Sequence, residues 1–220
     1  SCRYGDCLLR GPFGGAWVGI SSRIRKGESH LRETDHTLAQ LIDMHGPCEL
    51  MRSPRPHFHT LVWAIINQQL SVKAAKTIEE RLLAYLDTDI VTADLLKGKR
   101  ESSLRRCGLS GAKISYISEL GRRVRSGALD LDALEALDDD RVSAVLMELP
   151  GVGRCTADML LMFSLGRLDV LPIGDLALRK SISALYGLPD DANAEKFLVV
   201  TDCWRPYRSI ASWYCWAAVD

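Results

Sequence analysis

The sequence predicts an all-α fold, and three observations carry that prediction. Apolar residues recur at helical spacing in most segments, and glycine or proline follows where the spacing stops. The 220 residues are 47% hydrophobic and 25% charged, which is typical of a soluble globular chain of one or two domains. The expected helical segments are 34–44, 58–70, 71–86, 112–124, 141–149, 157–163 and 176–186.

The N-terminal residues 1–28 lack this periodicity. They are rich in glycine, serine and arginine, which predicts a poorly ordered or loosely packed arm. The helices that follow have clear starting signals, because Thr34 or Asp35 can cap the first and Ser71 the third. Asp138 is a candidate cap for the segment 141–149.

Several functional classes are not expected from the composition. No stretch approaches ~18 consecutive apolar residues, which argues against a membrane span, and no secretory leader pattern opens the chain. The seven cysteines are scattered without a CxxC pair, which is typical of reduced thiols, and His57 and His59 have no partners that would complete a metal site. We therefore expect an intracellular protein, in the bacterial cytoplasm or in the nucleus of a eukaryote, without a bound metal.

The charge is balanced overall and uneven along the chain. The formal net charge is zero, which argues against an indiscriminate nucleic-acid binder. Basic residues gather in 97–125 and acidic residues follow in 130–140. Both runs fit solvated helix faces, and the basic run also fits a surface that meets phosphates.

The stretch from Leu149 to Asp158 (Leu-Pro-Gly-Val-Gly-Arg-Cys-Thr-Ala-Asp) predicts two helices joined by a glycine hairpin. Pro150 disfavours helix before it, and Gly151 and Gly153 allow a tight reversal of the backbone. The N–H groups at the start of the second helix have no partner within it, which suits an anion such as a phosphate. An ordinary Pro-Gly turn between helices is the alternative.

This string resembles the hairpin of the helix-hairpin-helix (HhH-GPD) DNA glycosylase superfamily, which grips a DNA phosphate near the damaged nucleotide. The segment 169–180 resembles the part of the family that carries the catalytic aspartate, and Asp175 falls on that position. The resemblance implies phosphate contacts by Gly151, Gly153 and Thr156. Arg179 is a further candidate for a phosphate contact, and a solvated surface role fits it equally well.

Two further strings match the family in the same order. The segment 64–75 looks like the loop that enters the minor groove, where Gln69 or Leu70 matches the wedge that fills the gap left by the flipped nucleotide. A helix-helix turn with buried amides is the alternative. The segment 108–113 also looks like the glycosylase family.

The C-terminal segment 204–216 is similar to the last helix of the 3-methyladenine DNA glycosylase II branch. In that branch a Trp at the position of Trp216 lines the base pocket, and Tyr214 and Trp63 are further candidates. Some of these aromatic residues fit a core role instead. Some glycosylases of this superfamily carry a four-cysteine iron–sulfur loop near the C-terminus, but Cys203 and Cys215 alone cannot supply it, so no cluster is expected.

The resemblance implies a reaction that these residues can support. Breaking a glycosidic bond builds positive charge on the sugar, and a carboxylate such as Asp175 can stabilise that charge and orient water. An alkylated purine is already cationic, so it leaves without a general acid and stacks well on an aromatic ring. Glycosylases of the endonuclease III branch that also cut the backbone carry a lysine where this chain has Cys155, which predicts hydrolysis without lyase activity.

The resemblance therefore implies two helical lobes around a DNA-binding cleft. The hairpin lobe is expected at about 72–185, and the other lobe at about 29–71 plus 186–220. The expected function is excision of 3-methyladenine-type bases from damaged double-stranded DNA by a monomer, with no cofactor beyond a monovalent cation that the hairpin could hold. A glycosylase for oxidised or mismatched bases and a non-catalytic DNA-binding module are the alternatives.

Overall fold

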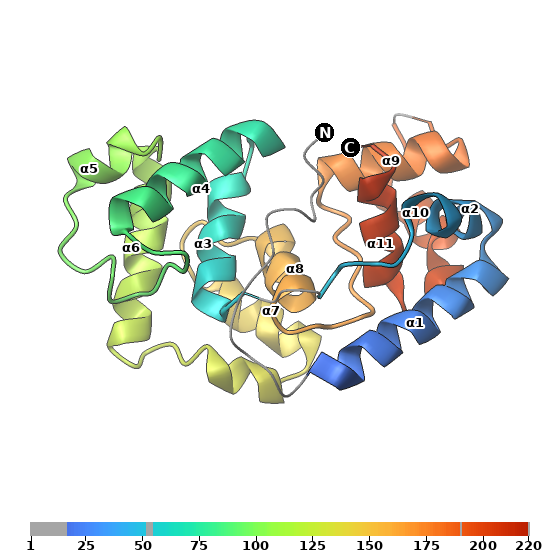
Figure 1. The fold of residues 1–220 in the computed structure, drawn as a ribbon, viewed down its shortest axis with the longest axis horizontal. Coiled ribbons are helices and arrows are strands. Elements are labelled where there is room, and N and C mark those ends of the chain that lie inside the picture. Colours follow the sequence, from blue (N-terminus) through green and yellow to red (C-terminus); the bar gives the residue numbers. More distant parts are fainter. Residues whose placement is uncertain (1–16, 52–54, 190, 220) are drawn as a thin grey trace. The chain divides into compact units, whose positions relative to one another are not determined.

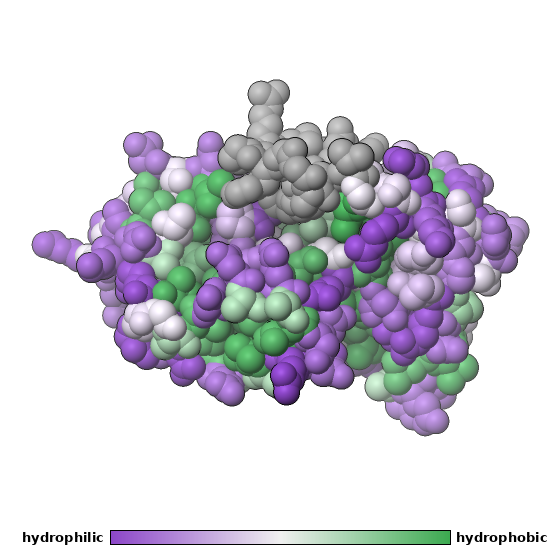
Figure 2. All heavy atoms as spheres, turned by 90° about the horizontal axis from the view of Figure 1, so that it is seen from below, coloured by the Kyte–Doolittle hydropathy of each residue, from purple (hydrophilic) through white to green (hydrophobic). Residues whose placement is uncertain are grey.

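The computed structural model describes residues 17–51, 55–189 and 191–219, and these residues form helices and loops without a strand. This confirms the predicted all-α class. None of the described helices is long and apolar enough to cross a membrane. Hydrophilic residues cover most of the face drawn in Figure 2, with smaller apolar areas between them.

The chain folds as two compact units. The central unit is Arg55–Leu165, and the terminal unit combines Ser1–Pro54 with Gly166–Asp220. Both differ from the predicted lobes, whose boundaries were expected near 71 and 185. The helix before residue 71 belongs with the hairpin because it packs against the helix that follows the hairpin. The predicted DNA-binding cleft stays a prediction.

The central unit is organised around one buried helix, α3 (His57–Asn67), in which every residue from Phe58 to Ile66 except Trp63 is buried. It packs against three other helices of the unit, as Figure 1 shows. The remaining elements of the unit are α4 (Val72–Leu86), α5 (Glu101–Arg106), α6 (Gly111–Arg125), the 3₁₀ helix η1 (Asp132–Ala136), α7 (Asp139–Met147) and α8 (Arg154–Phe163).

A buried ionic group joins the start of the central unit to α4. Arg55 and His59 both reach Glu79, at 2.5 Å and 3.4 Å from its Oε1 atom. The backbone N–H of Val91 donates to Nδ1 of His59, so the ring proton is on Nε2 and can be donated to Glu79. Burial raises the pKa of Glu79, but the hydrogen bond from His59 and the charge of Arg55 outweigh it, and the pKa ends below its ordinary value.

The terminal unit is built around the C-terminal helix, α11 (Arg208–Ala217), which packs against α1 (Trp17–Thr34), α2 (His36–His45) and α9 (Leu176–Tyr186). Two short elements precede α11: α10 (Ala194–Val200) and the 3₁₀ helix η2 (Asp202–Trp204). Asp35 caps α2 and also accepts hydrogen bonds from Tyr186 and Trp204. This buried carboxylate therefore ties α2 to α9 and η2.

The predicted N-terminal arm is wrong for its described part, because α1 begins at Trp17. Ile24 and Leu31 of α1 are buried, and Gly27 lies so close to Ile210 and Tyr207 that a β-carbon there would collide with them. Buried residues this sparse give little periodic signal, which is why the sequence pattern missed the helix. Residues 1–16 of the predicted arm lie outside the described residues.

Helix starts follow the expected cap chemistry. The side chains of Asp35, Ser71 and Asp138 each accept a hydrogen bond from a backbone N–H in the first turn of their helix, as predicted. Ser110 does the same for α6. Local polar residues therefore account for where these helices begin.

Candidate active site and nucleic-acid interface

The predicted glycine hairpin lies between α7 and α8, but the positive φ expected at both glycines is found at Gly151 alone, since Gly153 has φ of −100°. Leu149 and Val152 are buried and anchor it to the central unit, and Val152 donates its N–H to the carbonyl of Leu149 at 3.1 Å. Gly151 has φ of +76°, and a β-carbon at this position would collide with the ring of Tyr116 on α6. Gly151 is therefore required both for its backbone conformation and for its close approach to Tyr116.

The start of α8 is open. Gly153 caps the helix without a side-chain hydrogen bond, it is exposed, and a β-carbon there would meet nothing within 4 Å. Gly153 therefore supplies no side-chain acceptor to the first turn of α8, whose N–H groups form the positive end of the helix dipole. This geometry suits the predicted phosphate contact at Gly153.

Two of the residues predicted to contact a phosphate have side chains that are engaged within the protein. The Thr156 side chain is buried and its hydroxyl accepts a hydrogen bond from Gln68, so this oxygen is already engaged with the turn between α3 and α4. Arg179 donates to the carbonyl of Ala192 at 3.2 Å, and its guanidinium lies 5.1 Å from the ring centre of Phe197. These contacts give Arg179 a packing role between α9 and α10, and its contact with a phosphate stays a prediction.

Asp175 lies at the N-terminus of α9 in the terminal unit and is half-buried. Its Oδ1 atom accepts two hydrogen bonds, from the backbone N–H of Leu178 at 2.7 Å and from the indole N–H of Trp216 at 3.0 Å. No described residue donates to Oδ2. The carboxylate is therefore fixed by one oxygen and keeps the other for a ligand.

The two aromatic candidates on α11 have different roles. Trp216 is 5% exposed and contacts the carboxylate of Asp175 directly. Tyr214 is completely buried, and its hydroxyl lies 2.7 Å from Oε1 of Glu28 and 2.9 Å from the carbonyl oxygen of Gly46. Tyr214 therefore belongs to the core of the terminal unit, which corrects its assignment to a base pocket because no face of its ring is accessible.

The third candidate, Trp63, lies on α3 in the central unit. Its side chain is half-buried and packs edge-on against Phe163, with 5.6 Å between the ring centres. Its place in a base pocket stays a prediction.

The predicted wedge is the exposed turn between α3 and α4. Gln69 has φ of +56°, a left-handed conformation that is strained for a residue with a side chain, and Leu70 is 40% exposed. The preceding residue, Gln68, points the other way and hydrogen-bonds to the hairpin. The turn therefore presents two consecutive side chains outward, as a wedge requires.

Sequence reasoning missed three polar residues beside this interface. Gln68 and Lys113 hold the turn, through contacts between residues far apart in the sequence. Asp158 lies buried on α8 and accepts a hydrogen bond from Arg154 at 3.0 Å. Burial raises the pKa of Asp158 to about 6, although the hydrogen bond and charge of Arg154 act in the opposite direction. Of these contacts, only the pair of Arg154 and Asp158 has a local signal in the sequence, because the two residues are one helical turn apart.

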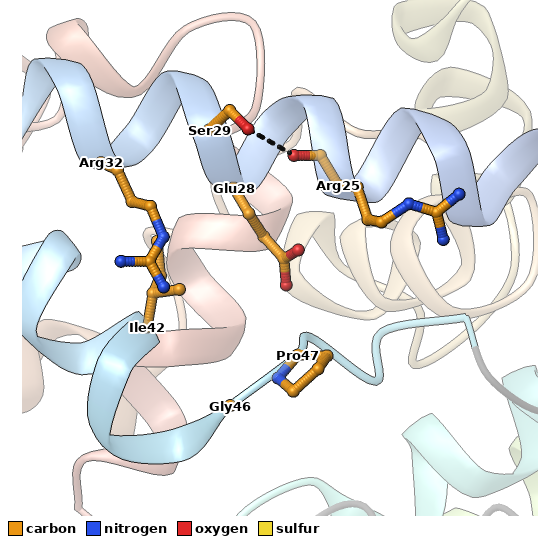
Figure 3. Close-up of a pocket in the computed structure, with 7 residues that line it drawn as sticks. All are labelled: Arg25, Glu28, Ser29, Arg32, Ile42, Gly46 and Pro47. Atoms are coloured by element: carbon orange, nitrogen blue, oxygen red, sulfur yellow. Dashed lines mark hydrogen bonds between the residues drawn. The ribbon is translucent and has the colours of Figure 1, made fainter.

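The described residues offer no metal site, and none of the predicted site residues lines the pocket in the terminal unit. The described residues contain no group of three or more His, Cys, Asp or Glu side chains that could hold a metal ion. A pocket of about 280 Å³ lies in the terminal unit beside α1 and the end of α2 (Figure 3). Two of its charged side chains are engaged within the protein, because Glu28 accepts from the N–H of Cys48 and Arg32 pairs with Asp43.

The resemblance allows a monovalent cation that is held by backbone carbonyl oxygens of the hairpin. The oxygen of Leu149 accepts from Val152, and the oxygen of Gly151 accepts from Gln68. Each carbonyl keeps a second lone pair, so a monovalent cation at this place stays a prediction.

The fold and these motifs define the class of protein. The family model of the HhH-GPD superfamily of base excision DNA repair proteins matches residues 62–206. This chain belongs to that superfamily.

Individual relatives cover nearly the whole chain. DNA-3-methyladenine glycosylase 1 of Schizosaccharomyces pombe is 30% identical over 90% of this chain and 88% of its own length. The structure of the 3-methyladenine DNA glycosylase of that yeast in complex with abasic DNA has a TM-score of 0.80, covering 87% of this chain and 95% of the other. A DNA-3-methyladenine glycosidase structure from Bacillus halodurans is 35% identical with a TM-score of 0.70, covering 87% and 88%.

Proposed function

We propose that this protein is a DNA glycosylase of the 3-methyladenine DNA glycosylase II type, which excises alkylated purines from duplex DNA in base excision repair. The carboxylate of Asp175 carries the proposal: one oxygen is fixed by Leu178 and Trp216, and the other accepts no hydrogen bond from a described residue. The names of the similar yeast and bacterial proteins support the choice of an alkylated purine as substrate.

The reaction requires stabilisation of charge on the sugar. As the bond between C1′ and the base breaks, its electron pair moves to the base and C1′ becomes positive. Asp175 is negative beside that carbon and stabilises it until the oxygen of a water molecule bonds to C1′ and the water's proton leaves. The carboxylate is held by hydrogen bonds before the reaction starts, so little reorganisation is needed.

The choice of an alkylated purine is supported by its ability to leave without a general acid. An N3- or N7-alkylated purine carries a positive charge, so it departs as a neutral base when it takes the electron pair. Such a base also binds favourably against an aromatic face, and Trp216 beside Asp175 supplies the nearest indole within the terminal unit. An oxidised or mismatched base is neutral and gains less from both effects.

We also propose that the enzyme has no lyase activity. A lyase needs an amine that forms a Schiff base with the sugar, and the family position of that lysine is Cys155, in the first turn of α8. Its neighbour Arg154 carries a guanidinium group and not the primary amine that a Schiff base requires. The product is therefore an abasic site with an intact backbone.

The central unit is proposed to hold the DNA. The open N-terminus of α8 at Gly153 would bind a phosphate, and the exposed Gln69 and Leu70 would fill the space left by the flipped nucleotide. We propose that a monomer inside the cell does this without a redox cofactor.

Base release from defined duplexes tests the proposal. Duplexes that contain 3-methyladenine, 7-methylguanine, an oxidised guanine or a mismatch are incubated with the protein, and free bases are separated by chromatography. We expect release of the methylated purines alone. Release of only the oxidised or mismatched base would indicate another lesion, and binding without any release would indicate a non-catalytic module.

A further inference from the structure

Lys113 of α6 closes the carboxyl end of α3. Its ammonium donates to the carbonyl of Ile66 at 2.7 Å and to the carbonyl of Gln68 at 2.9 Å. Carbonyls at the end of a helix have no partner within the helix, and a positive charge there is favourable. The bonds hold the backbone immediately before the exposed residues Gln69 and Leu70.

Gln68 then connects this turn to the glycine hairpin. Its side-chain amide donates to the carbonyl of Gly151 at 2.8 Å and to the hydroxyl of Thr156 at 3.0 Å. Both N–H donors of the amide are therefore used on the hairpin and on the helix that follows it. Gln68 is therefore held by Lys113 at its backbone carbonyl and binds the hairpin with its side chain.

Helix α6 also supports the hairpin directly. Tyr116 is one turn after Lys113, and its ring lies against Gly151 so closely that a β-carbon there would not fit. The same face of α6 therefore holds the turn through Lys113 and the hairpin through Tyr116. Gln68 connects the turn to the hairpin. Each of the three parts, the turn, the hairpin and α6, therefore contacts the other two.

We propose that Lys113 and Gln68 are positioning residues that fix the turn 68–71 to the hairpin 150–153, so that the wedge enters the duplex in register with the phosphate grip. This inference rests on the proposed function. Inserting a wedge unstacks a base pair, and the duplex pushes back on the inserted side chains. A turn without these hydrogen bonds would yield to that force, and the flipped state would be less populated.

The test compares excision of a methylated base that is paired in the duplex with excision of one that is unpaired and already partly unstacked. Lys113→Met and Gln68→Met remove the hydrogen bonds and keep similar volume. Single-turnover excision is measured on a duplex with the methylated base paired, and on one with that base opposite an abasic analogue. We expect both variants to slow excision from the paired duplex by roughly tenfold or more, and from the loosened duplex by less than about threefold.

Controls separate positioning from folding. Lys113→Arg keeps a charged donor and should retain at least about half of the wild-type rate on the paired duplex. Lys196→Met, on the exposed surface of α10, should match the wild type on both duplexes. A variant that had only lost folded protein would lose activity equally on the two duplexes. An equal loss, or no loss on the paired duplex, would overturn the proposal.

A second readout does not depend on the lesion. 2-Aminopurine next to an abasic analogue becomes fluorescent when its stacking is disturbed, and we expect saturating wild-type protein to raise this fluorescence more than either variant does. If the wild type raises it but releases no methylated purine, the proposed substrate fails and the positioning proposal stands. Equal fluorescence for wild type and both variants would refute the positioning proposal.

Discussion

Gly151 and Gly153 are two residues apart and differ in backbone conformation and in surroundings. Gly151 has positive φ and lies against Tyr116, so both its conformation and its surroundings exclude a side chain. Gly153 has φ of −100°, which any residue adopts, and open space where a β-carbon would be. Stability therefore depends on Gly151, whereas only a ligand would be sensitive to a side chain at Gly153.

Alanine at each position separates these roles. Gly151→Ala should lower the free energy of unfolding by about 2–4 kcal/mol, from the strained backbone and the collision with Tyr116. Gly153→Ala should leave the melting temperature unchanged and weaken binding to abasic-site DNA by roughly tenfold, because its methyl group would meet the phosphate. Equal DNA affinity of Gly153→Ala and wild type would contradict a phosphate contact at this residue.

Asp158 supplies a pH-dependent prediction. Burial raises its pKa to about 6, so the folded protein binds a proton more tightly than the unfolded chain does. The cost of keeping the ionised carboxylate buried is therefore present above pH 6 and disappears as the pH falls toward the ordinary value near 4. Asp158→Asn should raise stability by about 1–3 kcal/mol at pH 7.5, with a gain that shrinks between pH 6 and pH 4. Denaturant unfolding at several pH values measures it, and a pH-independent difference would refute this explanation.

At the scale of elements, Asp175 is the N-cap of α9, in addition to its proposed catalytic role. Its Oδ1 atom accepts the N–H of Leu178, a contact that asparagine can also make. Alanine cannot make it. The structural and chemical roles of this side chain can therefore be separated by choosing the substitution.

The two substitutions should differ in stability. Asp175→Ala should lower the free energy of unfolding by about 1 kcal/mol, whereas Asp175→Asn should stay within about 0.5 kcal/mol of the wild type. Denaturant unfolding of both variants checks this. Identical stabilities for the two variants would mean that the cap contributes nothing to α9.

The sequence pattern predicted the helices with a regular apolar face, and the structure confirms them in α3, α4, α6, α8 and α9. It also located the hairpin and the exposed turn, because glycine, proline and cap residues act locally. It missed α1, whose buried apolar side chains Ile24 and Leu31 are few. Helices were therefore readable where a regular apolar face or a local cap residue marked them.

Contacts between distant parts of the chain were not readable. The bond from Lys113 to Ile66 spans 47 residues and that from Gln68 to Gly151 spans 83, and no local pattern indicates either. Tyr214 and Trp216 are two residues apart on one helix, so the sequence could not tell which is core and which contacts Asp175. The unit boundaries failed for the same reason, since packing decides which helix belongs to which unit.

At the scale of the whole molecule, the proposed parts are divided between the units. The hairpin and the exposed turn belong to the central unit, and Asp175 and Trp216 belong to the terminal unit. The proposed grip and the proposed chemistry therefore belong to different compact units. A substitution of Asp175 in the terminal unit should therefore leave DNA binding by the central unit measurable. Retained DNA binding by such a variant would show this.

The proposed absence of a lyase step is tested on the whole enzyme. Borohydride reduction traps a Schiff base as a covalent protein–DNA adduct, and we expect none on a methylated duplex because Cys155 stands where the lyase lysine would be. A known lyase in the same buffer serves as the positive control. A trapped adduct that disappears on substitution of one lysine would contradict the prediction.

The central claim is that one carboxylate, fixed by Leu178 and Trp216, stabilises the sugar cation. The most direct test is single-turnover excision of a methylated purine by Asp175→Asn, alongside its affinity for abasic-site DNA. We predict a rate at least about 100-fold below wild type, with unchanged affinity and melting temperature. A rate within about threefold of wild type would contradict the claim.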